Sequence, residues 1–419
     1  MSKKITLTAV GDVGFRIEEN AETFDGVRDI MGAADIRLGQ LEQLISGETG
    51  GIRHLHFGGF DRSDMNGSSA WMPTAEKGAK VLEDAGFDVM TFATNHTMDI
   101  GDEALFDTID TLADHGITIF GAGRNLADAR KPAIKEIDGT KVGFLGYCSV
   151  VPRGYEATNT HAGCVPLRAT THLEVYDMQP GMPPRIHTKA DPKDKAAMID
   201  DIKKLKEQVD IVVVSMHWGV HWYPDVVAEY ERELGHAAID AGADLIIGQH
   251  AHIMKGVEVY KGKVIFYNLG NFSMRRYEGF EFKYETASGI NWISRFGIRA
   301  ETDPECPRYP YDINSQKNII VKVDIEDKKI SRVAYVPLWM NKNAVLMPVD
   351  PDSEKSDQHL RYLRWMSGSQ GFDVNFVKDG REVVIDTAYS LAKDAEKAAK
   401  EAAKEKAEAE MDNHKSPVF

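Results

Sequence analysis

The stretch Asp244-Leu-Ile-Ile-Gly-Gln-His-Ala-His252 joins an apolar run to two histidines. Its three consecutive apolar residues predict a buried strand that ends at Gly248. Residues two apart in an extended segment point to the same side, so we expect His250 and His252 to face one metal cluster. Imidazole is the commonest metal ligand among protein side chains. Taken alone, the stretch fits two histidines in an exposed loop equally well, so the rest of the chain must decide.

The same pattern recurs upstream, with an apolar segment followed at once by a polar side chain able to bind metal. These side chains are Asp12 after residues 5–10, Glu42 after residues 34–39, Asn95, His96 and Asp99 after residues 87–93, and His217 after residues 209–216. In open α/β sheets, ligands collect at the carboxyl ends of the strands, so we expect these side chains at one edge of a sheet. Each has a plainer alternative when taken singly, namely a turn residue, a surface acid or a helix cap.

Predicted strands and helices alternate along the chain, which indicates an α/β fold. Residues 209–216 form the most continuous β-branched run and predict a central parallel strand. Helices are predicted over residues 73–85, 103–115, 192–208 and 226–241. Further along the chain, a β-hairpin and a small β unit are predicted over residues 318–338 and 371–384, respectively.

Three segments lack a clear place in this alternation. Residues 148–190 are too long for a simple connection and are predicted to form either a functional lid or an inserted excursion. Residues 272–316 are rich in aromatic residues and arginine, and either line a pocket or pack as a loop onto the body. Residues 389–413 consist largely of Ala, Lys and Glu and predict a solvated helix, with a homo-oligomer through helix pairing as an alternative.

The composition is that of a soluble globular protein, with 419 residues of which 42% are hydrophobic and 27% charged. The net charge of −15 argues against a nucleic-acid-binding protein, which needs a basic face. Three scattered cysteines are too few for a disulfide framework or a cysteine-based zinc site. No apolar run is long enough for a transmembrane helix, and the N-terminal residues lack a secretory pattern. We therefore expect a cytoplasmic protein that contacts neither nucleic acid nor membrane.

The mixed set of carboxylate, amide and imidazole side chains predicts the kind of metal. Such a set suits two borderline divalent ions, such as Mn, Fe, Zn or Co. It contains too much nitrogen for calcium, and it lacks thiolates. Two neighbouring metals generate a hydroxide and hold both oxygens of a displacement reaction, so the pattern predicts a dinuclear hydrolase centre.

Short motifs containing these residues follow one another in a specific order. They are Gly11-Asp12, Gln40-Leu-Glu42, Ala93-Thr-Asn-His96 with Asp99 and Gly101, Gly121-Ala-Gly123, His217-Trp-Gly219, Gly248-Gln-His-Ala-His252 and Tyr267-Asn-Leu-Gly-Asn-Phe272. In this order they resemble the CapA (poly-γ-glutamate capsule biosynthesis) family of the calcineurin-like metallophosphoesterases. The resemblance covers about residues 5–348 and implies a four-layer α/β/β/α sandwich with a two-metal site at the strand ends. We expect one such domain over residues 1–348 and a C-terminal extension over residues 349–419.

The resemblance also implies a role for each matching residue. His96 would protonate the leaving group and would be oriented by Asp99. Asn271, in the closing Gly-Asn-Phe motif, would support the metal ligands from behind. The implied ligands are Asp12 and His252 for the first metal, Glu42 as the bridge, and Asn95, His217 and His250 for the second metal.

Four positions depart from the family's pattern. Gly14 stands where the broader superfamily often has a histidine, which leaves the first metal short of a ligand. Gln40 replaces the usual asparagine, and Ala251 replaces the proline between the two histidines. His221 stands where the family has a glutamate, so it either contacts substrate or adds a ligand.

Two hypotheses follow for the activity. In the first, a metal-bound hydroxide cleaves a phosphoester or a γ-glutamyl-type amide of a small or polymeric anionic substrate, with His96 as the general acid. Arg153, Arg275 and Arg276 are candidates for holding a carboxylate or phosphate of that substrate, although surface ion pairs are the plainer role for each. In the second, the protein is a non-catalytic accessory that binds an anionic polymer such as poly-γ-glutamate or assembles with a synthase.

Overall fold

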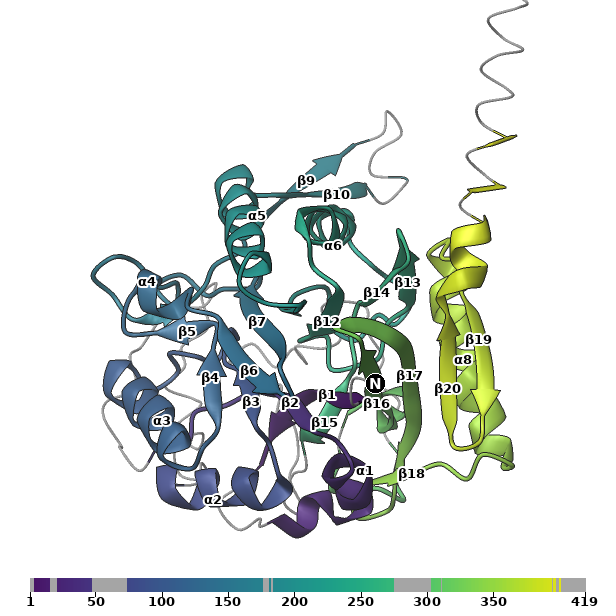
Figure 1. Cartoon of the computed structure of the whole chain (residues 1–419), viewed down its shortest axis with the longest axis horizontal. Helices are drawn as coiled ribbons and strands as arrows, with labels where there is room; N and C mark the ends of the chain where they lie inside the picture. Colours follow the sequence, from purple (N-terminus) through teal and green to yellow (C-terminus); the bar gives the residue numbers. More distant parts are fainter. Residues whose placement is uncertain are drawn as a thin grey trace, which may run out of the picture.

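Two β-sheets packed face to face form the centre of the protein, and helices cover both outer faces (Figure 1). The computed structural model describes residues 4–15, 21–46, 74–175, 181, 184–274, 303–309, 311–393, 395–396 and 399–400. The four-layer α/β/β/α sandwich that the resemblance implies is confirmed within these residues.

The larger sheet has ten strands. They are β1 (Ile5–Gly14), β2 (Ile36–Leu41), β3 (Val89–Thr91), β4 (Thr118–Phe120), β15 (Asn271–Met274), β16 (Lys317–Glu326), β17 (Lys329–Met340), β18 (Leu346–Pro348), β19 (Asn375–Asp379) and β20 (Glu382–Asp386). Their hydrogen-bonded order is β19-β20-β17-β16-β1-β2-β3-β4, with β15 paired to β1 and β18 to β17. Strands β1 to β4 run parallel, so their carboxyl ends meet at one edge of the sheet. The predicted hairpin is confirmed as β16 and β17, and the predicted small β unit as β19 and β20.

The smaller sheet has six strands in the order β13-β14-β12-β11-β7-β6. They are β6 (Ala133–Ile137), β7 (Thr140–Cys148), β11 (Ile211–His217), β12 (Leu245–Gln249), β13 (Val257–Tyr260) and β14 (Lys263–Phe266). Strand β11 lies between β7 and β12 and is parallel to both, which confirms the predicted central strand. Its continuous β-branched run is explained by burial on both faces, since Val213 packs between the sheets while Val212 and Val214 pack beneath the helices.

Helices lie on both outer faces of the paired sheets. They are α1 (Arg28–Gly32), α2 (Ala75–Ala85), α3 (Asp102–Asp114), α4 (Leu126–Ala129), α5 (Pro192–Lys206) and α6 (Glu229–Ala241), with a 3₁₀ turn η1 (Ala21–Val27) before α1. In Figure 1, α2 and α3 lie outside the larger sheet, and α5 and α6 lie outside the smaller one. Helix α2 begins and ends at the capping residues expected from the sequence. The Thr74 hydroxyl accepts a hydrogen bond at its start, and Gly86, with a φ of 86°, ends it. The helices predicted over residues 73–85, 103–115, 192–208 and 226–241 are confirmed as α2, α3, α5 and α6.

The C-terminal region holds a helix that the sequence pattern did not predict, α8 (Glu354–Ser369). Leu360, Leu363 and Met366 on this helix join the apolar core between the sheets. The helix was missed because its buried face is narrow and includes polar residues such as His359. Strand β20 pairs with β17, so residues 354–386 continue the main fold, and the division at residue 348 stays a prediction. Most of the predicted helix over residues 389–413 lies outside the described residues.

The described part of the segment 148–190 contains short strands. Its β8 (Gly163–Cys164) pairs with β5 (Ala122–Gly123), and its β9 (Ala169–Glu174) pairs with β10 (Arg185–Ala190) to form a projecting hairpin (Figure 1). Between these pairs the chain lies along the end of β7, where the N–H of Cys148 donates to the carbonyl of Val165 at 2.9 Å. Whether any part of the segment closes over a site stays a prediction.

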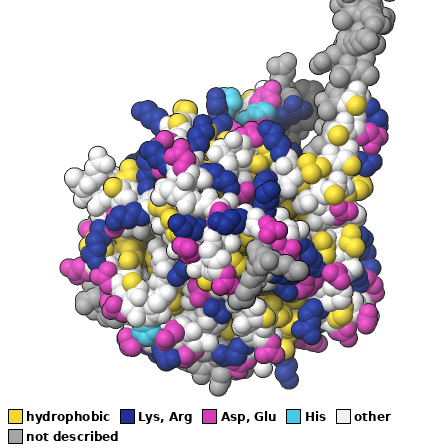
Figure 2. Space-filling view, in the orientation of Figure 1, with side chains coloured by type: hydrophobic (Ala, Val, Ile, Leu, Met, Phe, Trp, Pro, Cys, Tyr) yellow, Lys and Arg dark blue, Asp and Glu magenta, His cyan; other side chains and the backbone are white. Residues whose placement is uncertain are grey.

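Two observations concern the charge of the surface and the ability of the helices to cross a membrane. Across the described part of the face in Figure 2, Lys and Arg side chains are interspersed with Asp and Glu. Among the described residues, no helix is both long enough and apolar enough to cross a membrane.

Replacing Leu363 by alanine tests whether α8 is an integral part of the fold. Leu363 is fully buried, so the truncation leaves a cavity and should lower the free energy of unfolding by about 2–5 kcal/mol. Urea denaturation of the full chain measures this change. Arg361→Ala on the same helix is the matched control, because Arg361 makes an exposed ion pair with Glu354 and should change stability by less than about 1 kcal/mol. Equal, small effects for both variants would mean that α8 is only loosely attached.

Candidate metal centre

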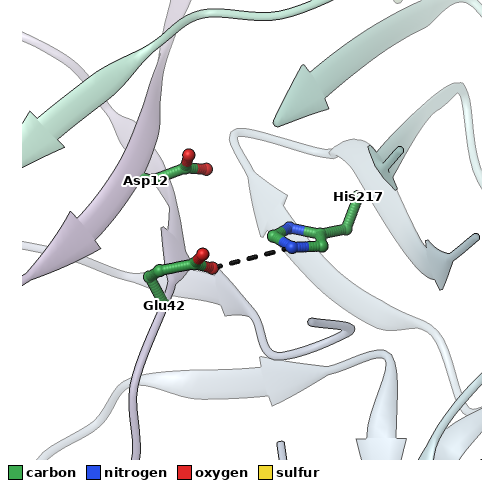
Figure 3. A group of neighbouring side chains, drawn as sticks. All are labelled: Asp12, Glu42 and His217. Carbon is green, nitrogen blue, oxygen red and sulfur yellow. Dashed lines mark ion pairs between the residues drawn. The ribbon is translucent and has the colours of Figure 1, made fainter. Parts of the chain in front are cut away.

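The ends of β1, β2 and β11 bring three acidic or imidazole side chains into one buried cluster. Asp12, Glu42 and His217 each offer a ligand atom, and these atoms all lie within 4.8 Å of one another. Glu42 Oε2 lies 3.7 Å from His217 Nε2, and Figure 3 shows the carboxylate and the ring facing each other with Asp12 beside them. All three side chains are buried. The predicted convergence of strand-end residues therefore occurs across the two sheets.

Asp12 reaches the cluster because β1 extends past the predicted end at Val10. The strand continues to Gly14, and Asp12 pairs with Gln40 on one side and with Asn271 on the other. A Cβ atom on Gly11 would lie 1.9 Å from the Gly270 carbonyl, so only glycine permits this close approach. The approach lets the N–H of Asp12 donate to that carbonyl at 3.0 Å.

The segment after β3 supplies groups to the other side of the cluster. Asn95 Oδ1 lies 2.7 Å from His217 Nε2, which is consistent with the two sharing one site. The Thr94 hydroxyl donates to Glu42 Oε2 at 2.9 Å and lies 3.2 Å from His217 Nε2. Thr94 was missed in the sequence, where its only signal was its place beside Asn95.

His250 and His252 face the cluster, but not for the reason that the sequence indicated. Both have positive φ values, 94° and 56°, so the segment is a sharp turn and not an extended strand. The backbone N–H of His250 donates to Asp12 Oδ1 at 3.2 Å, and its ring Nδ1 lies 3.2 Å from His217 Nε2. The ring of His252 lies beside Asp12, with Nδ1 at 3.3 Å from Asp12 Oδ2. The premise of an extended pair was wrong, although both rings reach the site.

A second set of contacts fixes the ring of His252. Its Nδ1 lies 2.7 Å from Asn271 Oδ1, and the Asn271 amide donates to the Tyr309 hydroxyl at 2.7 Å. Tyr309 in turn donates to the backbone carbonyl of Ser315 at 3.1 Å. Nε2 of His252 is then directed inward, 3.8 Å from Glu42 Oε1. Asn271 lies where a supporting role requires, and Tyr309 was not predicted.

The electrostatics of the cluster are those of an acidic site out of contact with water. Burial, together with the Asp12 carboxylate, raises the pKa of Glu42 to about 7. Burial lowers the pKa of His217 and His250 well below the usual range, and the neighbouring histidines lower it further. Burial opposes protonation of His252 as well, but the Asp12 and Glu42 carboxylates and the hydrogen bond to Asn271 together raise the pKa of that ring. Neutral His217 and His250 have a nitrogen lone pair available for a metal.

The residues present fit a divalent cation. Among the described residues, the buried Glu42 Oε1 has no hydrogen-bond partner. An unpaired buried carboxylate oxygen is costly unless a cation or a donor meets it. Carboxylate oxygen with imidazole nitrogen is the ligand chemistry of Mn, Fe, Zn and Co. Asp12, Glu42 and His217 could therefore hold an ion, with Asn95, His250 and His252 within reach as further ligands.

His96 lies at the rim of this cluster. Its Nδ1 is 2.7 Å from Asp99 Oδ2, and its Nε2 is 3.8 Å from Glu42 Oε1. The His96 side chain is 30% exposed, compared with 2% for Glu42. The ring therefore borders both the ligands and the solvent.

His221 also joins the site. Its ring centroid lies 3.9 Å from that of His250 and 5.3 Å from that of His252, and Trp222 stacks beside it at 4.6 Å. Burial lowers the pKa of His221 well below the usual range, so the ring is neutral. The position is compatible with a substrate contact or an added ligand, and the choice between these stays a prediction.

Three predicted substrate-binding arginines and Gly14 remain. Arg153 is exposed and makes no ion pair with any described residue. Arg275 and Arg276 lie outside the described residues. Gly14 faces Met274, whose sulfur would lie 2.7 Å from an added Cβ, so a larger side chain here would have to displace that methionine.

With this geometry established, comparison with known proteins identifies the family. Residues 6–276 match the family model described as bacterial capsule synthesis protein PGA_cap. The chain belongs to this family. The matched residues include Asp12, Glu42, Asn95, His217, His250, His252 and Asn271. The predicted CapA relationship is confirmed.

Several curated PGA_cap relatives share this region. The PGA biosynthesis protein CapA of Bacillus subtilis is 36% identical over 202 residues, which cover 48% of this chain and 46% of that protein. The capsule biosynthesis protein CapA of Bacillus anthracis is 28% identical over 65% of this chain and 60% of its own length. A probable polyglutamine synthesis accessory protein of Mycobacterium tuberculosis is 31% identical over 44% of each chain. The chain thus spans about half the length of the curated relatives that it matches.

Two solved structures also overlay on the chain. One is the calcineurin-like phosphoesterase YfkN of Bacillus subtilis, at 14% identity and a TM-score of 0.38, covering 87% of this chain and 98% of that one. The other is a hypothetical protein of Thermus thermophilus, also at 14% identity and a TM-score of 0.38, covering 80% and 98%.

Cation binding at this centre should depend on pH. Each pH unit below the Glu42 pKa of about 7 lowers the carboxylate fraction roughly tenfold, so protons compete with the cation in acid. Because the pKa of Glu42 is raised in the folded state, folding favours the protonated side chain. Without a cation, the stability that this protonated form gives the fold is therefore lost as the pH rises through about 7. Added Zn²⁺ or Mn²⁺ should therefore raise the melting temperature more at about pH 8 than at about pH 5.5.

Scanning calorimetry at the two pH values measures this difference. Glu42→Gln should abolish the response to metal. Glu231→Gln is the matched control, since burial also raises the pKa of Glu231 but its carboxylate caps α6 outside the cluster. A metal response of equal size at both pH values, or one that survives in Glu42→Gln, would contradict the assignment.

Proposed function

We propose that the protein is a metal-dependent hydrolase whose cation is held by Asp12, Glu42 and His217. The observation that carries the proposal is the buried convergence of these three side chains, with ligand atoms all within 4.8 Å. Two neighbouring buried carboxylates are strongly unfavourable without a cation to neutralise them. A divalent cation bound there polarises a phosphoryl or carbonyl oxygen of the substrate. Asn95, His250 and His252 complete the ligand set, which is large enough for two ions.

His96 is the proton donor to the leaving group in this proposal. Its Nε2 lies near Glu42 while part of the ring faces solvent, so a substrate atom bound at the cluster would come within its reach. With Asp99 accepting from Nδ1, the protonated imidazolium form of the ring would present its Nε2–H as the transferable proton. Asn271 orients the ligand His252 in a similar way, through an oxygen that accepts from Nδ1.

The bond cleaved is a phosphoester or a γ-glutamyl-type amide of an anionic substrate. The names of the two Bacillus relatives, which refer to PGA and capsule biosynthesis, favour the amide. The name of the mycobacterial relative contains the words accessory protein, and it favours the second candidate, a non-catalytic partner of a polymer synthase. A proton donor beside the proposed metal ligands supports the hydrolase over this candidate, because a binding protein does not need a proton donor.

Metal analysis and turnover assays distinguish the two candidates. Protein purified without chelator should contain between one and two equivalents of divalent metal and should hydrolyse a phosphodiester, a phosphomonoester or a γ-glutamyl amide. His96→Gln should lower kcat by about 10²–10⁴-fold while metal content is unchanged, since it removes only the general acid. His161→Gln is the matched control, because His161 is exposed and its ring lies within hydrogen-bond distance of the Thr158 and Thr160 hydroxyls, away from the cluster.

The accessory candidate predicts the opposite result. Less than about half an equivalent of metal, with no turnover of any substrate after Mn²⁺ is added, would reject the hydrolase. Binding of poly-γ-glutamate by such a protein would then support the accessory role.

Arg153 is the described arginine proposed to hold the substrate anion. Its guanidinium is exposed and unpaired among the described residues, on a turn two residues before Tyr155. Arg153→Met should raise KM about tenfold with kcat within about twofold, because a charge-assisted hydrogen bond contributes about 1.5–3 kcal/mol. Steady-state kinetics measure both constants. Arg381→Met, at the exposed turn between β19 and β20, is the control and should leave KM unchanged. An unchanged KM in Arg153→Met would remove Arg153 from the substrate site.

A further inference from the structure

We infer that Tyr155 is a positioning residue that fixes the ring of His96 through Asp99. The inserted segment 148–190 would thereby take part in the reaction, although it supplies none of the proposed metal ligands. The kinetic consequence of this inference rests on the proposed hydrolase function, whereas its structural consequence does not.

A continuous chain of hydrogen bonds links the three side chains. The Tyr155 hydroxyl donates to Asp99 Oδ1 at 3.0 Å, and Asp99 Oδ2 lies 2.7 Å from His96 Nδ1. A carboxylate held at both oxygens cannot rotate without breaking one of these contacts. The plane of Asp99 is therefore set by Tyr155, and the plane of Asp99 sets the direction of the His96 ring.

Tyr155 is itself held rigidly. Its side chain is fully buried in the core beneath the larger sheet. Its N–H donates to the Pro152 carbonyl at 2.9 Å across a tight turn, in which Gly154 has a φ of 86°. Its carbonyl accepts from the N–H of Cys164 at 3.0 Å. A Cβ on Gly163 would lie 2.2 Å from that carbonyl, so the loop that contains Tyr155 and strand β8 are in close contact at this point.

The need for such support follows from the exposure of His96. A side chain that is 30% exposed is less restricted by packing than a fully buried one. A general acid works only when its proton points at the leaving group, and a displacement of about 1 Å can cost about 100-fold in rate. Tyr155 constrains the His96 ring from its buried side, through Asp99, where the exposed side of the ring lacks packing.

Tyr147 offers a matched comparison within the same chain. It is also a buried tyrosine, and its hydroxyl donates to Asp201 at 3.1 Å. That aspartate pairs with Arg130 and with no histidine in the described residues. Removing the Tyr147 hydroxyl therefore deletes a similar hydrogen bond without touching the site.

The inference is tested by comparing Tyr155→Phe with Tyr147→Phe in the full-length, metal-loaded chain. For substrates with poor leaving groups, kcat of Tyr155→Phe should fall about tenfold or more, with KM within about twofold. For substrates with good leaving groups, which need little protonation, the loss should be less than about twofold. Tyr147→Phe should match the wild type on both. A general loss of folded protein would lower all rates equally and would not depend on the leaving group.

A spectroscopic measurement tests the same inference without turnover. In zinc-loaded protein labelled with ¹⁵N-histidine, the His96 Nδ1–H proton bonded to Asp99 should give a downfield resonance, assigned by its loss in His96→Gln. Tyr155→Phe should shift this resonance upfield and speed its exchange with solvent, and Tyr147→Phe should not. Asp99→Asn should abolish it.

The kinetic and spectroscopic measurements show which of the two proposals fails. If the wild type hydrolyses nothing, the hydrolase function fails, and the resonance still decides whether Tyr155 positions His96. If the wild type is active but Tyr155→Phe retains both the resonance and the leaving-group dependence of the wild type, Tyr155 has only a packing role and the inference is overturned.

Discussion

The proximity of two buried carboxylates, Asp12 and Glu42, is the constraint on which the rest of the site depends. Each charge is unfavourable in a buried position, and each makes the other more unfavourable, which is why the pKa of Glu42 lies near 7. Two hydrogen-bond donors partly compensate these charges. The backbone N–H of His250 donates to Asp12, and the Thr94 hydroxyl donates to Glu42. A cation would complete this compensation, and the ligand set has the composition to hold one.

The backbone geometry of the site follows from the same constraint. Strand β1 comes into near contact with the segment before β15, where the N–H of Asp12 donates to the Gly270 carbonyl, and Gly11 permits this approach. His250, His252 and Trp222 all have positive φ values, which are unusual for residues with side chains. Such strain is typical of functional sites, where the surrounding fold supplies the stabilisation that holds it. The two sheets and their three apolar cores provide that stabilisation here.

Much of the fold could be predicted because its signals are local. The β-branched run of β11, and the caps of α2, need only neighbouring residues to be recognised. Helix α8 could not be recognised in this way, because its narrow apolar face is completed by residues of β13 and β17 that are distant in sequence. For the site, the positions of Asp12, Glu42 and His217 followed from strand ends. Thr94, Tyr155 and Tyr309 did not, since a hydroxyl becomes part of a site only through the partner that folding brings to it.

The sequence by itself determined the α/β class, the family and the set of side chains able to bind metal, because these depend on residue type and on order along the chain. Only the tertiary structure decided how those side chains meet. It showed that His250 and His252 reach the cluster through a sharp turn. It also linked residues 148–190 to His96 through Tyr155 and Asp99. The physical reason is that hydrogen bonds and buried charges act over a few ångströms in space, and the pairs that they join here are as many as 238 positions apart along the chain.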